Sequence, residues 1–292
     1  MFANACKLAR CFTRPVVVTR RYFDGSVECG CGAFIVINED GWILTAAHLL
    51  ESSAAILRHA DEIGQYYARV CDVQRDAEID PGKKLETIGK LKTNPRWITN
   101  HAFWWGEDDA TLTEVRLLAE ADLAIGRLVP FDPDAVTAYP TLKHPSGLGI
   151  GEMLCKIGYP FQKIGAAYNE TNGVFELESG VRSLASFPIE GIYTRTLPAG
   201  RSGDGRYEVK FLETSSPGLV GQSGGPIFDA HGIVWSVQSR TDCRPYGASA
   251  TGRPRRRISG EGLYLTLGVG VHPELIVAFL KENGIGFTLS DN

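Results

Sequence analysis

Three short segments of the sequence carry side chains that together could do nucleophilic chemistry. His48 ends the run TAAH, Asp122 opens the run DLAI, and Ser223 lies in the glycine-rich run GQSGGP. A serine hydroxyl is a weak nucleophile until an imidazole removes its proton, and the imidazole needs a carboxylate that sets its tautomer and stabilises its charged form. The segments therefore predict a triad of Ser223 as nucleophile, His48 as general base and Asp122 as orienting carboxylate.

The residues beside each candidate suit these roles. Gly221 and Gly224 have no side chain, so the backbone around the nucleophile can pass close to a substrate. Asp122 is followed by the apolar residues of a strand, whereas the rival carboxylates Asp108 and Asp109 lie in an acidic stretch that is typical of solvated chain. No cysteine and histidine cluster has metal-ligand spacing, so we expect neither a metal nor a cofactor.

The chain order His48, Asp122, Ser223 resembles that of the trypsin/chymotrypsin-like serine proteases and differs from the orders in subtilisins and α/β-hydrolases. Other stretches are similar to the high-temperature-requirement branch of that family. They are GAFIV at 32–36, DGWIL at 40–44, IGYP at 157–160 and GIV at 232–234. The resemblance covers residues 23 to 282 and is patchy between 50 and 121.

This resemblance implies further site residues. In the family, the backbone N–H groups at the positions of Gly221 and Ser223 form the oxyanion hole, and the residue six before the nucleophile, here Pro217, lies at the base of the primary pocket. Because Pro217 is not an acid, cleavage after Lys or Arg is disfavoured, and we expect a small or medium apolar residue there. The edge strand that pairs with substrate would be Ser236, Val237 and Gln238.

The elements that must position these residues are short apolar runs bounded by Gly, Pro, Asp and Asn, a pattern that favours antiparallel strands. The pattern alone is typical of a sandwich or barrel, and together with the resemblance it predicts an all-β, chymotrypsin-like fold of two antiparallel six-stranded β-barrels, with a partly helical insertion in the first barrel and a C-terminal helix. The expected runs are 34–37, 42–45, 123–128, 153–157, 191–197, 207–211, 233–237 and 263–271.

The resulting division of the chain places the triad across two barrels. The first barrel carries His48 and Asp122, and the second carries Ser223. We expect the peptide-binding module of many high-temperature-requirement proteases to be absent, because few residues follow the final predicted helix. The predicted units are an N-terminal extension 1–22, a first barrel 23–140 with an insertion at about 51–116, a second barrel 141–273, and a helix and tail 274–292.

The insertion at 51–116 separates His48 from Asp122 by more chain than a compact barrel needs. Its first part, Ser52 to about Val73, has apolar residues at helical spacing. It ends in an aromatic group, Trp97, Phe103, Trp104 and Trp105. Two interpretations stay open: an elaborated loop that buries its own aromatics, or a docking surface for substrate or a regulatory protein partner.

Bulk properties limit the partners. The chain has 292 residues, 43% of them hydrophobic, and a formal charge of −4, so we expect no nucleic-acid or membrane partner. Its seven cysteines show no disulfide framework, and no signal-peptide core is evident, so we expect a cytoplasmic protein. The basic stretch 253–257 is interpreted as a solvated loop, a site for an acidic activator or a processing site.

The sequence as a whole predicts a serine endopeptidase that acts on protein or peptide through an acyl-enzyme, and we expect it to be intracellular and regulated by a partner. Two alternatives remain. One is a protease-fold binding or scaffolding module without turnover, and the other is an esterase that uses the same triad.

Overall fold

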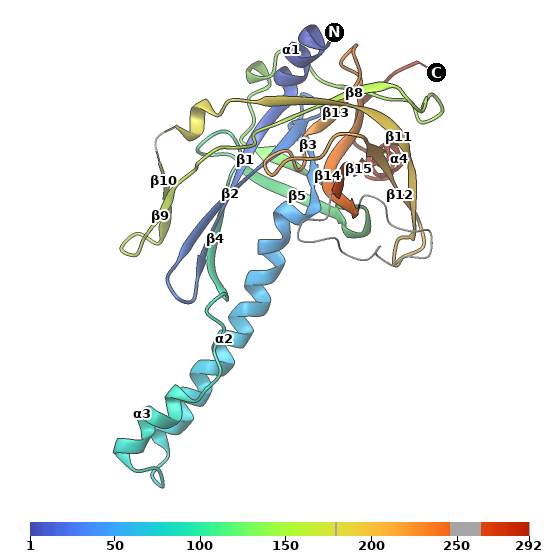
Figure 1. The fold of residues 1–292 in the computed structure, drawn as a ribbon. Coiled ribbons are helices and arrows are strands. Elements are labelled where there is room, and N and C mark those ends of the chain that lie inside the picture. The colour runs from blue at the N-terminus through green and yellow to red at the C-terminus, as the bar shows by residue number, and fades with distance from the viewer. Residues whose placement is uncertain (179, 246–263, 292) are drawn as a thin grey trace.

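Two curved β-sheets form the body of the protein (Figure 1). The computed structural model describes residues 1–178, 180–245 and 264–291, so the basic stretch at 253–257 lies outside the described residues. The first sheet has the strand order β4-β1-β2-β3-β6-β5. Its strands are β1 (Thr13–Tyr22), β2 (Val27–Val36), β3 (Trp42–Ala46), β4 (Ile98–Trp104), β5 (Thr111–Leu118) and β6 (Leu123–Val129).

The interior of the first sheet comes from its central strands. Phe34 and Ile35 on β2, Leu44 on β3 and Ile125 on β6 are all completely buried. Both faces of these strands are covered, because the sheet curls around its own core and its other face packs toward the second sheet and the N-terminal helix α1 (Ala3–Phe12). Such double burial explains why these segments are continuous apolar runs.

The second sheet closes on itself. Its order β13-β8-β11-β12-β15-β14 is completed by a pairing of β13 with β14, which gives a six-stranded barrel, while β7 and β16 extend it beside β14. Its strands are β7 (Thr141–Leu142), β8 (Met153–Gly158), β11 (Phe187–Arg201), β12 (Glu208–Thr214), β13 (Pro226–Phe228), β14 (Val234–Pro245), β15 (Tyr264–Val271) and β16 (Thr288–Leu289). The predicted two-barrel, chymotrypsin-like fold is confirmed.

Smaller elements complete the fold. The helix α4 (Pro273–Glu282) follows β15, and the side chain of His272 caps it by accepting a hydrogen bond from the Glu274 N–H. A separate hairpin of β9 (Ala166–Asn169) and β10 (Val174–Leu177) lies beside β2 (Figure 1). The remaining pieces are short 3-10 turns at Ala47–Leu50, Ala119–Ala121, Pro133–Ala135 and Val181–Ser183.

Two predicted boundaries are wrong. The first barrel begins at Thr13, not at residue 23, because β1 lies between β2 and β4 inside the sheet. The predicted insertion 51–116 also contains β4 and β5, which are strands of the barrel. Arginines flank the three valines of β1, and polar residues alternate along β4 and β5, so these strands lack the continuous apolar run of a central strand.

What remains of the insertion is a helical arm, residues 51–90, which projects from the first sheet (Figure 1). It consists of α2 (Glu51–Arg75) and α3 (Pro81–Gly89), and Ser52 is the only residue of these two helices that is buried. The predicted helix from Ser52 to Val73 is confirmed. No helix among the described residues has both the length and the apolar character of a membrane span.

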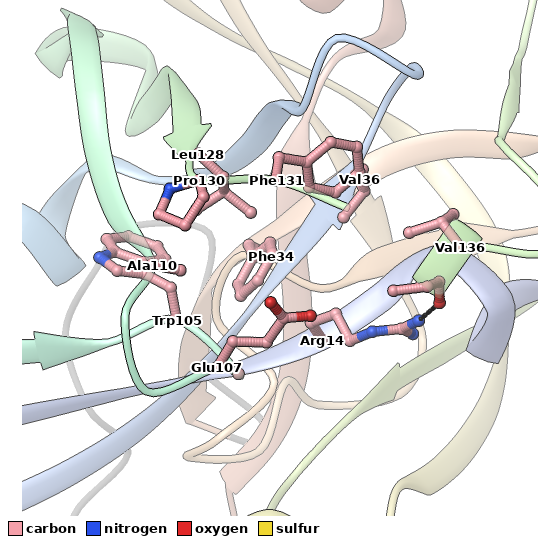
Figure 2. Close-up of a pocket in the computed structure, with 12 residues that line it drawn as sticks. Arg14, Phe34, Val36, Trp105, Glu107, Ala110, Leu128, Pro130, Phe131 and Val136 are labelled. Carbon is pink, nitrogen blue, oxygen red and sulfur yellow. Dashed lines mark hydrogen bonds between the residues drawn. The ribbon is translucent and has the colours of Figure 1, made fainter. Parts of the chain in front are cut away.

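The aromatic group is mostly packed against the body. Trp97 is 7% exposed and contacts Phe23 with ring centroids 5.4 Å apart, and Trp105 is 4% exposed against Phe34 at 5.5 Å. Figure 2 shows Trp105 and Phe34 lining a small apolar pocket in the first barrel, beside which Arg14 donates a hydrogen bond to the Ala135 carbonyl. Trp97 and Trp105 are therefore buried against residues outside the predicted insertion, Phe23 and Phe34.

Candidate active site

His48 and Asp122 are in direct contact at the rim of the first barrel. His48 lies in the short turn that follows β3, and Asp122 directly precedes β6, the hydrogen-bonded neighbour of β3. The Nδ1 atom of His48 is 2.9 Å from Oδ2 of Asp122 and 3.1 Å from Oδ1. The carboxylate thus holds the ring by Nδ1 and leaves Nε2 for proton transfer, as a general base requires.

The backbone of Asp122 is bent to bring this contact about. Its φ of 52° and ψ of 40° are left-handed, a conformation that Asp tolerates better than most residues. The bend lets the Asp122 carbonyl accept a hydrogen bond from the Ala47 N–H at 3.2 Å, while Oδ1 accepts one from the His48 N–H at 2.9 Å. The turn that carries the histidine is therefore tied to the aspartate by backbone as well as side chain.

Ser239 supplies a third support to the carboxylate. Its hydroxyl donates a hydrogen bond to Oδ2 of Asp122 at 2.5 Å from the second barrel. Burial opposes ionisation of Asp122, but the hydrogen bonds from His48 and Ser239 hold the pKa of the carboxyl below its ordinary value. The same hydrogen bond with Asp122 raises the pKa of His48 against the opposing effect of burial. A charged imidazole is therefore stabilised beside a charged carboxylate.

The loop that carries Ser223 is seated against the first barrel. The Ser223 carbonyl accepts a hydrogen bond from the Ala33 N–H of β2 at 2.8 Å. The φ of Gly224 is 81°, and a Cβ there would lie 2.1 Å from the Ala33 carbonyl oxygen and 2.3 Å from Oγ1 of Thr45. Only glycine fits this approach of the two barrels. The nucleophile loop therefore packs against β2 and against β3, the strand that precedes His48.

The Ser223 hydroxyl does not yet contact the imidazole. Its hydrogen bond is to the Ser239 carbonyl at 3.5 Å, and among the described residues no hydrogen bond joins it to His48. Catalytic hydrogen bonds are often long in unliganded enzymes and tighten in the substrate complex. Beside the hydroxyl, the N–H groups of Gly221 and Ser223 have no acceptor within the described part of the chain. Two donors thus flank the candidate nucleophile.

The predicted substrate strand is wrong in its register. Ser236, Val237 and Gln238 are buried. Ser236 and Val237 pair with β13, and Gln238 pairs with the Gly224–Gly225 backbone on one side and with β15 on the other. They therefore cannot add a peptide strand. The pairing with β13 ends at Val237, so the side of β14 that faces the triad becomes available only from Ser239 onward.

Two residues near the site were missed by sequence reasoning. Ser239 was overlooked because a serine within a strand, here β14, has no distinguishing pattern. Lys156 is buried on β8, and its Nζ donates hydrogen bonds to the carbonyls of Ser216 at 2.6 Å and Pro217 at 3.1 Å. The signal for Lys156 was its charge inside the apolar run at 153–157. Pro217 itself is half-buried in the loop before the nucleophile.

Comparisons with known proteins agree with this geometry. A model of the trypsin-like peptidase domain family matches residues 31–235. A solved structure of the HtrA-type protease AlgW, in a substituted form with a decapeptide, has a TM-score of 0.50 and 15% identity over 97% of this chain and 68% of that one. AlgW with a tripeptide has a TM-score of 0.48 and 16% identity over 98% and 65%.

No curated protein sequence matches the chain. The low identity to the solved structures means that they show a shared fold. This chain spans about two thirds of their length. The family model covers well over half of this chain, which confirms the resemblance to trypsin-like serine proteases. The chain belongs to the trypsin-like peptidase domain family and is a hydrolase of the serine-protease class.

Proposed function

We propose that the protein is an endopeptidase whose triad is Ser223, His48 and Asp122. The observation that carries the proposal is the two-oxygen contact of Asp122 with Nδ1 of His48, supported from the second barrel by Ser239. A carboxylate in this position fixes the tautomer in which Nε2 can accept a proton. The Asp122 side chain in this contact is 18% exposed, which is less than in an ordinary surface ion pair.

The reaction follows from these positions. Ser223 Oγ attacks the carbonyl carbon of the scissile bond while His48 Nε2 takes its proton. The N–H groups of Gly221 and Ser223 donate to the oxygen that becomes negative, and losing one such donor costs about 2.7–4 kcal/mol of barrier stabilisation. His48 gives the proton to the departing amine, and a water activated by the same ring then hydrolyses the acyl-enzyme.

The substrate is an extended peptide. From Ser239 onward, β14 has β15 on one side and no strand on the side of the triad among the described residues. An extended peptide can add to this edge by main-chain hydrogen bonds. The substrate-binding segment therefore begins at Ser239, three residues after the predicted start at Ser236. The structure of the HtrA-type protease AlgW with a decapeptide shows a protein of the same fold together with a peptide.

We propose that a regulatory protein partner controls the activity by binding to the helical arm. Leu57 on α2 is 72% exposed and Leu85 on α3 is 80% exposed. The arm begins at Glu51, three residues after His48, so a protein bound to it would act next to the general base. All seven cysteines are free thiols, which supports a cytoplasmic location.

A fluorophosphonate probe, which reacts only with an activated serine, tests the triad. We expect labelling of the wild type and none of Ser223→Ala or His48→Ala. Matched controls are Ser26→Ala and His231→Ala, which remove an exposed serine and an exposed histidine outside the site. Labelling that survives in Ser223→Ala would refute the assignment. Turnover of esters without cleavage of any peptide in a broad library would instead favour the esterase alternative.

A further inference from the structure

Lys156 is a buried cation without a counter-ion. Its side chain extends from β8 into the second barrel, and the residue is 1% exposed. Among the described residues no carboxylate forms a salt bridge with it. A buried charge is costly unless it is paired, so buried lysines normally have an acidic partner or a functional reason. The structure shows no such partner for Lys156.

The ammonium has a spare donor. Two of its three N–H bonds are used, by the carbonyls of Ser216 and Pro217. No acceptor for the third is present in the described part of the chain. The neighbouring Ser216 hydroxyl is also buried and without a hydrogen-bond partner. Two unsatisfied donors, the ammonium and the Ser216 hydroxyl, therefore lie at the Ser216–Pro217 turn. Among the described residues, no negatively charged group accepts a hydrogen bond from either of them.

The barrel is built to admit this ammonium. Gly268 on β15 stands beside it, and a Cβ at that position would lie 2.1 Å from Nζ of Lys156 and 2.6 Å from the Ser216 carbonyl oxygen. Any larger residue would displace the amine from the turn. Burial lowers the pKa of Lys156 to about 7, which a nearby carboxylate would reverse by stabilising the charged form.

We propose that Lys156 determines substrate specificity by placing its ammonium at the base of the primary pocket, where it binds the carboxylate of an Asp or Glu side chain on the acyl side of the cleaved bond. The inference rests on the proposed function, because it takes the Pro217 turn as the base of that pocket. It replaces the expected preference for an apolar residue. The missing counter-ion is thus delivered by the substrate.

Matched peptide pairs test the inference. Each pair carries Glu or Gln at the position before the cleaved bond within otherwise identical randomised flanks, so the two differ only in charge. The wild type should cleave the Glu member with a kcat/KM about 10- to 100-fold higher, as expected for a hydrogen bond to a charged partner. Lys156→Met should bring this ratio to about 1.

Lys210→Met is the matched control, because Lys210 belongs to the same barrel but faces Glu274 of α4. It should leave the Glu-to-Gln ratio unchanged. A wild type that reacts with the fluorophosphonate probe but cleaves the Gln member as well as the Glu member would overturn the inference, whether or not Lys156→Met folds. A purely structural role for Lys156 would lower stability without changing the ratio.

Binding separates this inference from the triad assignment. In the Ser223→Ala protein, which cannot form the acyl-enzyme, calorimetry should show tighter binding of product peptides that end in Glu than of those that end in Gln. If the wild type neither labels nor cleaves, a retained preference for Glu would sustain the Lys156 site while the proposed function fails. Equal binding of the two peptides would remove the site.

Discussion

At the scale of single residues, the Asp122 carboxylate is the centre of the site. It accepts hydrogen bonds from the His48 backbone N–H, from the His48 ring and from the Ser239 hydroxyl, so both oxygens are used. Each of these donors stabilises the charged carboxylate, and together they outweigh the burial that would otherwise raise its pKa. The group stays charged while its position is held from two barrels.

Removal of the Ser239 hydroxyl should weaken catalysis without unfolding the protein. Ser239→Ala takes away one charge-assisted hydrogen bond from Asp122, and we expect kcat/KM to fall about 10-fold. Ser202→Ala is the matched control, because its hydroxyl donates to Asp204 at 2.6 Å away from the site. Steady-state kinetics on one peptide would decide, and equal losses in the two variants would contradict the prediction.

Titration of His48 should show a midpoint above 6.5. Its pKa is raised by the Asp122 hydrogen bond, so the neutral ring that acts as base is lost as pH falls through a value above 6.5. Proton NMR of the ring in the Ser223→Ala protein measures this midpoint. Asp122→Asn should lower the midpoint, and Asp108→Asn should not. A midpoint at or below 6.5 in the Ser223→Ala protein would show that the contact is absent in solution.

The sequence was sufficient for residues that have a motif and insufficient for those that do not. His48, Asp122 and Ser223 each lie in a run of distinctive residues, and the structure brings the first two into contact. Ser239 and Lys156 act through long-range contacts that a single sequence does not encode in any local pattern. The register error at 236–238 has the same cause, since strand pairing decides which edge is free.

At the scale of elements, the nucleophile loop depends on one glycine. Gly224→Ala would put a Cβ 2.1 Å from the Ala33 carbonyl and would also strain a φ of 81°. We expect probe labelling to fall at least 100-fold because the loop must leave its seat on β2.

Gly205→Ala is the control for that variant, since Gly205 has a φ of 73° but nothing within 4 Å of its Cβ position. It should cost only the left-handed backbone strain, about 1–2 kcal/mol, with labelling intact. Circular dichroism would confirm that both variants fold. Full labelling of Gly224→Ala would show that contact with β2 is dispensable.

Elements with continuous apolar runs were predictable, whereas the edge strands β4 and β5 and the interior strand β1, whose three valines are flanked by polar residues, were not. The strands β3 and β6 coincide with the predicted runs 42–45 and 123–128, the run 34–37 covers the end of β2, and α2 has clear helical spacing. β4 and β5 lie at the two edges of the first sheet, where one face is solvated and polar residues are tolerated. Their pattern therefore resembles that of a loop, and they were assigned to the insertion.

At the scale of the whole molecule, the outer part of the arm should be dispensable for folding. Replacement of residues 71–90 by a short Gly-Ser linker removes α3 and the end of α2, none of which is buried, and keeps the aromatic contacts of Trp97. We expect the free energy of unfolding to change by less than about 1 kcal/mol.

Probe labelling of this shortened protein should match that of the wild type, because the triad contacts lie in the barrels. Cleavage that depends on a cell-lysate activator should be lost if the arm receives a regulatory partner. Urea denaturation and labelling kinetics measure the two effects separately. A large loss of stability would show that the arm belongs to the folding unit of the first barrel.

The point at which the arm joins the body has a mechanical consequence. α2 has 25 residues, so it is about 37 Å long, and it follows the His48 turn without an intervening loop. The Ser52 hydroxyl is 3.2 Å from the His101 ring on β4, and this contact holds the first turn of α2 against the sheet. The helix is then a lever: a tilt of about 5° moves its far end by about 3 Å while the histidine shifts by only tenths of an ångström. A partner that displaces the far end of α2 by a few ångströms would therefore move the His48 ring by a much smaller distance. A shift of that size is enough to change the distance between the imidazole and the Ser223 hydroxyl.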